Sequence, residues 1–293
     1  MATTTPPASI PVRSPLPSGL AGRTAVLLGG SSGIGLAAAG LLASVGARIL
    51  LVGRDEERLK AAVARVTAGA RPDAAAEVRG VPADVTDADA IAEVFEHAGA
   101  VDHVLMTAGS PAGIGLVTEV AGDAAQAAVA TPVAGVLGVV RAAVPRLEPG
   151  GSITLSSGIL VPRPRPGMSV PVAAAGAVET LARALAVELA PSRLRVNAIR
   201  YGAIDTPLLR SRFGAPGPEA DAAMAEEGAA AMAEAGAAAM AEAGAAAMAE
   251  AGAAMPLGRF GTAEEAASAA VFLMANPYMS GEVLTVDGGQ SLV

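Results

Sequence analysis

Short apolar runs alternate with longer, alanine-rich segments along most of the chain. From Arg23 onward the runs are four to six residues long: Thr24–Leu28, Arg48–Val52, Val101–Met106, Ser152–Leu155, Leu194–Ile199 and Glu282–Val286. Near-continuous apolar runs of this length are typical of strands that are buried on both faces of a parallel sheet. The segments between them are mostly long enough for crossover helices. We therefore predict an α/β fold with a doubly wound parallel sheet, in a single domain over residues 21–293.

Two segments depart from this alternation. Residues 1–20 are rich in Pro, Thr and Ser without periodicity, and we predict a disordered leader. Between Ala223 and Ala254 the chain nearly repeats an eight-residue unit, with methionines at 224, 232, 240 and 248. Ala, Met and Glu favour helix, but a Gly in each unit costs about 1 kcal/mol, and a period of eight does not match the helical 3.6.

We interpret this insertion, at about 219–254, as a tandem expansion in a tolerant loop of the substrate-lid region. The alternative is a mobile, methionine-lined lid, because methionine packs adaptably against irregular ligands. We expect the repeat to be dispensable for folding, since it adds no aromatic or branched core residues.

The composition narrows the classes of function. A formal charge of −8 and a near absence of aromatic residues argue against a nucleic-acid partner. The absence of cysteine excludes disulfides and thiolate metal sites. His97 and His103 have no carboxylate companion at metal-ligand spacing, so we expect surface or helix-end histidines and no metal. No secretory signal and no uninterrupted membrane-length apolar run is present, which favours a cytoplasmic protein without a membrane partner.

The first predicted strand leads into a glycine-rich loop that opens a helix. The run Gly-Gly-Ser-Ser-Gly-Ile-Gly occupies residues 29–35. Glycines allow the backbone to turn tightly and to approach a pyrophosphate, and the helix N-terminus then supplies free N–H groups. The strand before and the helix after make this motif specific for a dinucleotide. The predicted cofactor-binding residues are Gly29, Ser31, Ser32, Gly33, Ile34 and Gly35.

The end of the second strand indicates which dinucleotide binds. The position where an acid usually bonds the ribose 2′-hydroxyl of NAD is Gly53, and Arg54 follows it. A guanidinium pairs well with a 2′-phosphate, so we favour NADP(H), with Ser32 as a helper. The alternative is that Arg54 is a solvated residue at a helix start and Asp55 is the N-cap; both interpretations can hold together.

These motifs resemble the short-chain dehydrogenase/reductase family, in which the spacing is Gly-x-x-x-Gly-Ile-Gly. Further matches are Asp84-Val85, Thr107-Ala108-Gly109, Arg195-Val196-Asn197, Pro256-Leu257-Gly258-Arg259 and Asp287-Gly288-Gly289. The resemblance covers residues 23–293, interrupted by the repeat. It implies a Rossmann-like fold, a small-molecule substrate and a homodimer or homotetramer. It also implies further cofactor contacts from Asp84, Val85, Ala108, Gly109, Ile204 and Thr206.

The resemblance fails at the positions that carry the family's proton-transfer chemistry. Pro171 stands where the family has its catalytic Tyr, Ala175 where it has Lys, and Pro132 where it has the assisting Asn. Only the serine has a counterpart, Ser157, with Ser156 as second choice. No Tyr or Lys lies between Ser157 and Arg200, so a shift of register does not restore the pair.

Tyr201 is the candidate for a replacement proton donor. It stands where the family has a Pro beside the nicotinamide, and Arg200 next to it is expected to lower its pKa. The alternative is a buried packing tyrosine. The leading hypothesis is an NADP(H)-dependent oxidoreductase with a nonstandard active site, acting on a small carbonyl- or imine-like substrate. The alternatives are a non-redox biosynthetic catalyst, such as a cyclase or dehydratase, and a cofactor-binding pseudoenzyme.

Overall fold

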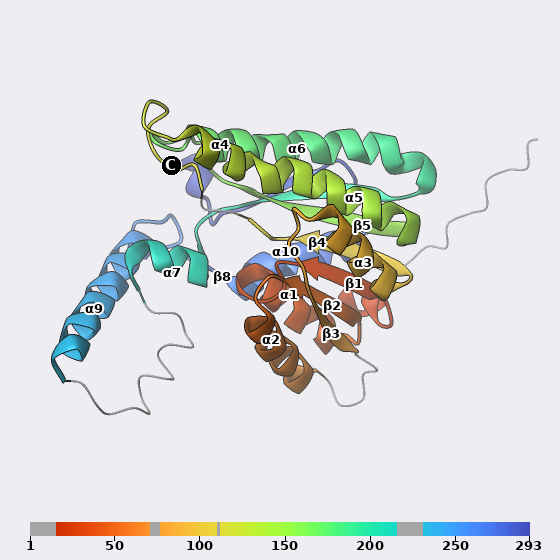
Figure 1. The fold of residues 1–293 in the computed structure, drawn as a ribbon, viewed down its shortest axis with the longest axis horizontal. Helices are drawn as coiled ribbons and strands as arrows, with labels where there is room; N and C mark the ends of the chain where they lie inside the picture. The colour runs from red at the N-terminus through yellow and green to blue at the C-terminus, as the bar shows by residue number, and fades with distance from the viewer. Residues whose placement is uncertain (1–15, 71–76, 110–111, 216–230) are drawn as a thin grey trace, which may run out of the picture.

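The computed structural model describes residues 16–70, 77–109, 112–215 and 231–293. Seven strands pair in parallel in the order β3-β2-β1-β4-β5-β6-β9 (Figure 1). The order reverses between β1 and β4, which marks the crevice where ligands bind in open α/β sheets. The strands are β1 Thr24–Leu28, β2 Arg48–Gly53, β3 Val78–Pro82, β4 Val101–Met106, β5 Leu147–Gly158, β6 Arg195–Tyr201 and β9 Val283–Val286.

Helices cover both faces of this sheet, which confirms the predicted doubly wound α/β fold. One face packs against α1 Gly33–Ser44, α2 Glu56–Gly69 and α10 Ala263–Ala275. The other face packs against α3 Ala88–Ala98, α5 Val136–Ala143 and α6 Ser169–Leu189, with α4 Gly122–Val129 beside α6.

Short elements connect the two layers. A second, two-stranded parallel sheet pairs β7 Ile204–Asp205 with β8 Gly261–Thr262. Between these strands lie α7 Pro207–Phe213 and α9 Ala231–Ala253. The 3₁₀ turns are η1 Pro17–Leu20, η3 Val144–Arg146, η4 Ala190–Ser192 and η5 Gln290–Leu292, and η2 Ala130–Gly135 is a π-helical turn.

Alternation along the strands divides the core into two halves. Val26 and Leu28 of β1 face α3, α5 and α6, whereas Ala25 and Leu27 face α1, α2 and α10. Because successive strand residues point to opposite faces, the same rule assigns every side chain near the carboxyl end of the sheet to one layer. This assignment decides which polar residues meet at the site.

The start of the domain lies earlier than the sequence predicted. Residues 1–15 of the expected leader lie outside the described residues, but Pro17–Leu20 forms η1 and Leu20 is buried against α10. The leader boundary at residue 20 was therefore wrong. An apolar side chain at its end, next to the first strand, is enough to anchor this turn to the core.

The repeat is not a loop over the part that the structure describes. Residues 219–230 lie outside the described residues, but Ala231–Ala253 form a helix, α9, that packs on α7. Gly244 sits against the backbone of Phe213 and Gly214, and Met248 is buried. The helix-favouring Ala, Met and Glu therefore outweigh the glycines, and one of those glycines makes the close approach to α7 possible.

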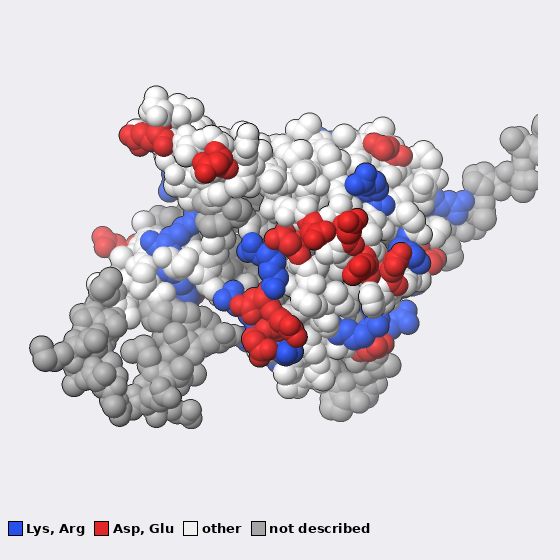
Figure 2. Space-filling model, viewed as in Figure 1, with Lys and Arg blue, Asp and Glu red and all other residues white. Residues whose placement is uncertain are grey.

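Two helical stretches, Gly122–Arg146 and Ser169–Ser192, are long and apolar enough by length and composition to span a membrane. Both lie flat along the sheet in Figure 1. On the face drawn in Figure 2, charged side chains gather below them, and the layer of α4, α5 and α6 is largely uncharged. The outward side of this layer includes Leu137 and Val187, which are 45% and 78% exposed.

The two glycines of α9 with described surroundings provide a matched test of its packing. A Cβ on Gly244 would lie 2.6 Å from Phe213 O and 2.7 Å from Gly214 C, whereas a Cβ on Gly252 would meet nothing closer than 3.6 Å. Gly244→Ala is expected to lower the free energy of unfolding by about 1–3 kcal/mol through overpacking. Gly252→Ala is expected to be neutral or to raise it by up to about 1 kcal/mol. Urea denaturation measures both, and equal effects would contradict packing through Gly244.

Candidate functional site

The N-terminus of α1 lies at the carboxyl end of the sheet, at the reversal of strand order. Ser32 precedes the helix with φ −160° and makes no side-chain capping hydrogen bond, and the first turn holds no acidic residue. Ile34 and Gly35 continue this turn. The first N–H groups of a helix have no intrahelical partner and carry a partial positive charge. This turn is therefore suited to an anionic group such as a pyrophosphate.

Glycines shape the cradle in front of that helix. Gly29 and Gly33 have φ values of +86° and +52°, which only glycine adopts readily. A Cβ on Gly29 or on Gly35 would lie 2.7 Å from Thr107 Oγ1. Thr107 donates its hydroxyl hydrogen to a backbone carbonyl, Leu28 O at 3.3 Å or Gly29 O at 3.2 Å. The loop thus closes onto the end of β4, and this close packing of backbone requires glycine at positions 29 and 35.

The sequence analysis gave no role to Thr107. The hint in the sequence was the position of Thr107, which stands where the family has an Asn after the fourth strand. The next residue, Ala108, donates its backbone N–H to Leu28 O at 3.1 Å, and Gly109 has open space around its Cα. Ala108 therefore lies beside the glycine loop.

Arg54 stands at the end of β2 with its side chain 77% exposed. Its Nη1 lies 3.9 Å from Asp84 Oδ2. The pKa of Asp84 is lowered, chiefly because Thr86 donates its side-chain hydroxyl and its backbone N–H to the carboxylate. Asp55 caps α2 by accepting from Arg58 N, so the alternative interpretation of this segment also holds.

Ser31, rather than Ser32, is the serine beside Gly53. A Cβ on Gly53 would lie 2.9 Å from Ser31 Oγ, so any larger residue there would displace the serine. Gly53, Ser31 and Arg54 together leave a small, open, basic corner at the end of β2. The sequence analysis named Ser32 as the helper and listed Ser31 among the cofactor residues; the serine that lies next to Gly53 is Ser31.

The remaining predicted cofactor residues border the same crevice. Thr206 caps α7 by accepting from Leu209 N, and its Cγ2 would lie 3.4 Å from a Cβ on Gly33. Ile204, two residues earlier, is buried on β7. The carbonyl of Val85 lies next to Gly135 in η2, where a Cβ would approach it to 3.2 Å. The loops after β1, β3, β4 and β6 therefore meet at one edge.

The serine at the end of β5 lies on the α6 face of the sheet. Ser157 Oγ donates to Glu179 Oε1 at 2.8 Å or to Ala175 O at 3.3 Å. Glu179 is 4% exposed and accepts from Arg200 through Nε at 2.9 Å and Nη2 at 2.6 Å. This ion pair raises the pKa of the Arg200 guanidinium. Strand register explains the cluster, because Ser157 pairs with Arg200 across β5 and β6.

Glu179 was missed from the sequence. Its signal was an acid in the middle of the apolar helix Val172–Leu189, four residues after Ala175 and therefore one turn along on the same face. A charged side chain on a buried helix face needs a partner, and the arginine that follows the run Leu194–Ile199 was available.

Proline occupies two of the four positions that the sequence analysis aligned with the family's proton-transfer residues. Pro171 lies in the first turn of α6, and Pro132 lies within the π-helical turn η2. Neither ring can donate a proton. Ala175 lies one turn beyond Pro171, and the only lysine of the chain, Lys60, is paired with Glu56 and Glu57 on α2. No lysine elsewhere in the chain can take over the Ala175 position.

Tyr201 is not placed as a proton donor. Alternation turns it away from Ser157 and into the core beside α1 and α10, where it is 7% exposed. Its hydroxyl has no hydrogen-bond partner among the described residues, and burial raises its pKa. Arg200, which was expected to lower that pKa, is held by Glu179 on the opposite face. The alternative, a buried packing tyrosine, describes its surroundings.

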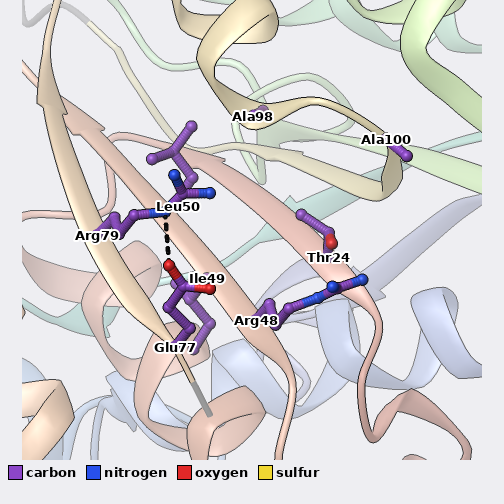
Figure 3. Close-up of a pocket in the computed structure, with 8 residues that line it drawn as sticks. All are labelled: Thr24, Arg48, Ile49, Leu50, Glu77, Arg79, Ala98 and Ala100. Atoms are coloured by element: carbon purple, nitrogen blue, oxygen red, sulfur yellow. Dashed lines mark ion pairs between the residues drawn. The ribbon is translucent and has the colours of Figure 1, made fainter. Parts of the chain in front are cut away.

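A cavity of about 140 Å³ lies at the other end of the sheet, where β1, β2 and β3 begin (Figure 3). Glu77 and Arg79 on its wall form an ion pair at 3.2 Å. Ligands of open α/β sheets bind at the carboxyl ends of the strands, so this cavity is separate from the candidate site. His97 ends α3 as expected, but His103 was misplaced: it is buried in β4 and contacts Ser152 Oγ.

A family model described as Enoyl-(Acyl carrier protein) reductase matches residues 29–232 and 229–291. Carbonyl reductase family member 4 of Danio rerio is 30% identical over 276 residues, which cover 92% of this chain and 99% of that protein. The chain belongs to the short-chain dehydrogenase/reductase family. This family consists of oxidoreductases that use nicotinamide cofactors.

Two solved structures bear on the altered site of this short-chain dehydrogenase/reductase. A short-chain oxidoreductase from Pseudomonas aeruginosa PAO1, described as containing an atypical catalytic center, is 29% identical with a TM-score of 0.75, covering 92% of this chain and 97% of that one. MalC Reductase/Diels-Alderase from Malbranchea aurantiaca is 25% identical with a TM-score of 0.77, covering 94% and 98%.

The burial of Tyr201 leads to a prediction about stability. An unpaired buried hydroxyl is destabilising, so Tyr201→Phe is expected to raise the free energy of unfolding by about 1 kcal/mol. NADPH binding should be unchanged. Urea denaturation measures the first quantity and calorimetry the second. Tyr278→Phe is the control, because that side chain is 97% exposed and its loss of a hydroxyl should be neutral. A marked loss of stability in Tyr201→Phe would show that the hydroxyl has a partner.

Proposed function

We propose that this protein is an NADP(H)-dependent oxidoreductase whose substrate needs little proton assistance. The observation that carries the proposal is the contrast between two neighbouring regions. The turn at the start of α1 is uncapped and open to a pyrophosphate, whereas α6 carries no ionisable group at Pro171 or Ala175. A bound nicotinamide would supply hydride chemistry, and the protein would hold the cofactor and the substrate in position.

The missing acid has a measurable consequence. General acid/base catalysis is typically worth about 10²–10⁴-fold in rate. A simple ketone, which must gain a proton as it accepts hydride, would lose that factor here. An iminium or an already polarised quinone would not lose this factor in rate. The substrate class is therefore a small molecule whose reduction does not depend on a side-chain acid.

The corner formed by Gly53, Ser31 and Arg54 supports NADP(H) over NAD(H). An acid at position 53 would repel a 2′-phosphate, and glycine removes both its charge and its bulk. Asp84 draws Arg54 only weakly, since their nearest atoms are 3.9 Å apart and both side chains are well exposed. A phosphate oxygen can compete for the guanidinium, because exposed ion pairs are worth little and arginine binds phosphate bidentately.

Arg54→Ala tests this choice of cofactor. We expect NADPH affinity to fall by about 10- to 100-fold with NADH affinity unchanged, as for loss of a charged hydrogen bond. Dissociation constants from fluorescence titration measure both. The charge-matched control is Arg79→Ala, which removes an exposed arginine at the opposite end of the sheet. Equal dissociation constants for the two cofactors in the unmutated protein would contradict the proposal.

A second candidate function is a non-redox catalyst, such as a cyclase, in the same crevice. The structural similarity to MalC Reductase/Diels-Alderase favours it, because that name joins a reductase with a cycloaddition catalyst on one fold. The absorbance of bound NADPH at its reduced-nicotinamide band distinguishes the non-redox function from the oxidoreductase. Product formation with NADPH unconsumed supports the non-redox function, and consumption with substrate supports the oxidoreductase.

The largely uncharged outer surface of α4, α5 and α6 supports a homo-oligomer, a dimer or tetramer. Val187 is 78% exposed on α6 and is the most exposed large apolar side chain of this layer. Val187→Glu is expected to shift the protein toward monomer, because a charge buried at an interface is costly. Sedimentation at micromolar concentration measures this, with Val293→Glu at the 65% exposed C-terminus as a control. A monomer in the unmutated protein would contradict the proposal.

A further inference from the structure

The direction of one hydrogen bond at the site differs from what a carbonyl substrate needs. Ser157 has a single hydroxyl hydrogen, and both groups within reach of its oxygen are acceptors: Glu179 Oε1 at 2.8 Å and Ala175 O at 3.3 Å. Whichever one it bonds, the hydrogen points into the protein. The lone pairs of the partly exposed serine then remain for the site, and a lone pair can only accept.

The Glu179 carboxylate is fixed as an acceptor by its other partner. Arg200 donates to both of its oxygens, in the fork geometry of a bidentate pair. The guanidinium has donors only, and it also donates to Thr285 Oγ1 at 3.3 Å. The Glu179 side chain is 5% exposed and that of Arg200 is 19% exposed. Glu179 has no hydrogen to offer Ser157, and the hydrogen bonds that Arg200 donates go to Glu179 and Thr285. The acceptors in reach of the Ser157 hydrogen are Glu179 Oε1 and Ala175 O, both on the protein side.

We propose that Ser157 accepts a hydrogen bond from the substrate, and that the substrate group it faces is the N–H of an iminium. Glu179 and Arg200 are positioning residues that set this polarity. The inference rests on the proposed oxidoreductase function and narrows its substrate class. A ketone or quinone oxygen would need a donor at this position, and an alcohol would need a base to take its proton, which Pro171 and Ala175 do not provide.

The chemistry balances without a side-chain acid. Hydride addition to the iminium carbon breaks the C=N π bond, and its electron pair becomes the lone pair of a neutral amine. The nicotinamide is oxidised by two electrons and the iminium is reduced by two. The N–H hydrogen stays on nitrogen throughout, bonded to Ser157 Oγ. No proton enters or leaves, in agreement with a site whose family acid position is a proline.

Three probes of similar size test the polarity of Ser157: protonated 3,4-dihydroisoquinoline, its N-methyl iminium and 1-tetralone. The first offers an N–H, the second keeps the charge without the hydrogen, and the third offers only an acceptor. Each is titrated by calorimetry into the protein saturated with NADP⁺, which cannot donate hydride. We expect the N–H iminium to bind about tenfold or more tightly than either of the others, as for one charged hydrogen bond.

Variants of Ser157, Glu179 and Arg200 test whether these residues set the preference for the N–H iminium. The double variant Glu179→Leu, Arg200→Leu replaces the pair by apolar side chains, which is often neutral for stability. It removes the charged acceptor and leaves the longer contact to Ala175 O, at 3.3 Å, to hold the Ser157 hydrogen, so 1-tetralone should gain and the N–H iminium should lose affinity. Arg200→Lys keeps a cation against Glu179 and should retain the preference. Ser157→Ala should abolish it, leaving the two iminium probes equal.

Each outcome decides the inference. Equal binding of the two iminium probes by the unmutated protein, tighter binding of 1-tetralone, or binding of none of the three overturns it. An unchanged ranking in the double variant overturns the role of Glu179 and Arg200. The probes are also titrated without cofactor. Failure of NADP⁺ to bind would reject the proposed function, while the ranking of the probes would still test the hydrogen bond.

Discussion

The buried ion pair between Glu179 and Arg200 is the interaction on which the site depends. It joins the middle of α6 to the end of β6 and holds the hydroxyl of Ser157 between them. The Glu179 side chain is 5% exposed, so its charge needs a partner, whereas Arg200 is 19% exposed and reaches water. The pair therefore fixes the distance between helix and strand and also the direction of the serine hydroxyl. Position and polarity at the site have one physical origin.

The sheet brings this pair and the cofactor crevice to the same edge. In a parallel sheet all carboxyl ends lie on one side, so the loops after β1, β2 and β4 and the end of β5 converge although they are far apart in sequence. Alternation along the strands then sorts the residues. Ser157 and Arg200 turn toward α6, and Tyr201 turns toward α1 and α10. A shift of the register of β6 by one residue would turn Tyr201 toward α6 and Arg200 toward α1 and α10.

Most of the fold was predictable from the sequence, because buried strands and the glycine turn are local patterns. The runs Thr24–Leu28 and Val101–Met106 coincide with β1 and β4. The fate of Tyr201 and Arg200 was not predictable in the same way. Both lie next to each other after an apolar run, and only the strand register shows that they face different layers. The helix α9 was missed because the glycines and the period of eight argued against a helix, and the sequence alone does not show that Gly244 packs against the end of α7.

The fold accommodates the two prolines that stand at the predicted proton-donor positions. The first-turn N–H groups of a helix have no intrahelical partner, so Pro171 in the first turn of α6 removes no hydrogen bond. Pro132 stands inside a helical segment, where its missing N–H would leave a carbonyl unpaired. There the chain forms the π-helical turn η2, and Val136 N donates back to Thr131 O and Val133 O. At both positions the backbone alone thus accommodates a side chain that has no acidic proton. If these two positions are the family's donor positions, the proposed chemistry relies on the polar groups of β5, β6 and α6, namely Ser157, Arg200 and Glu179.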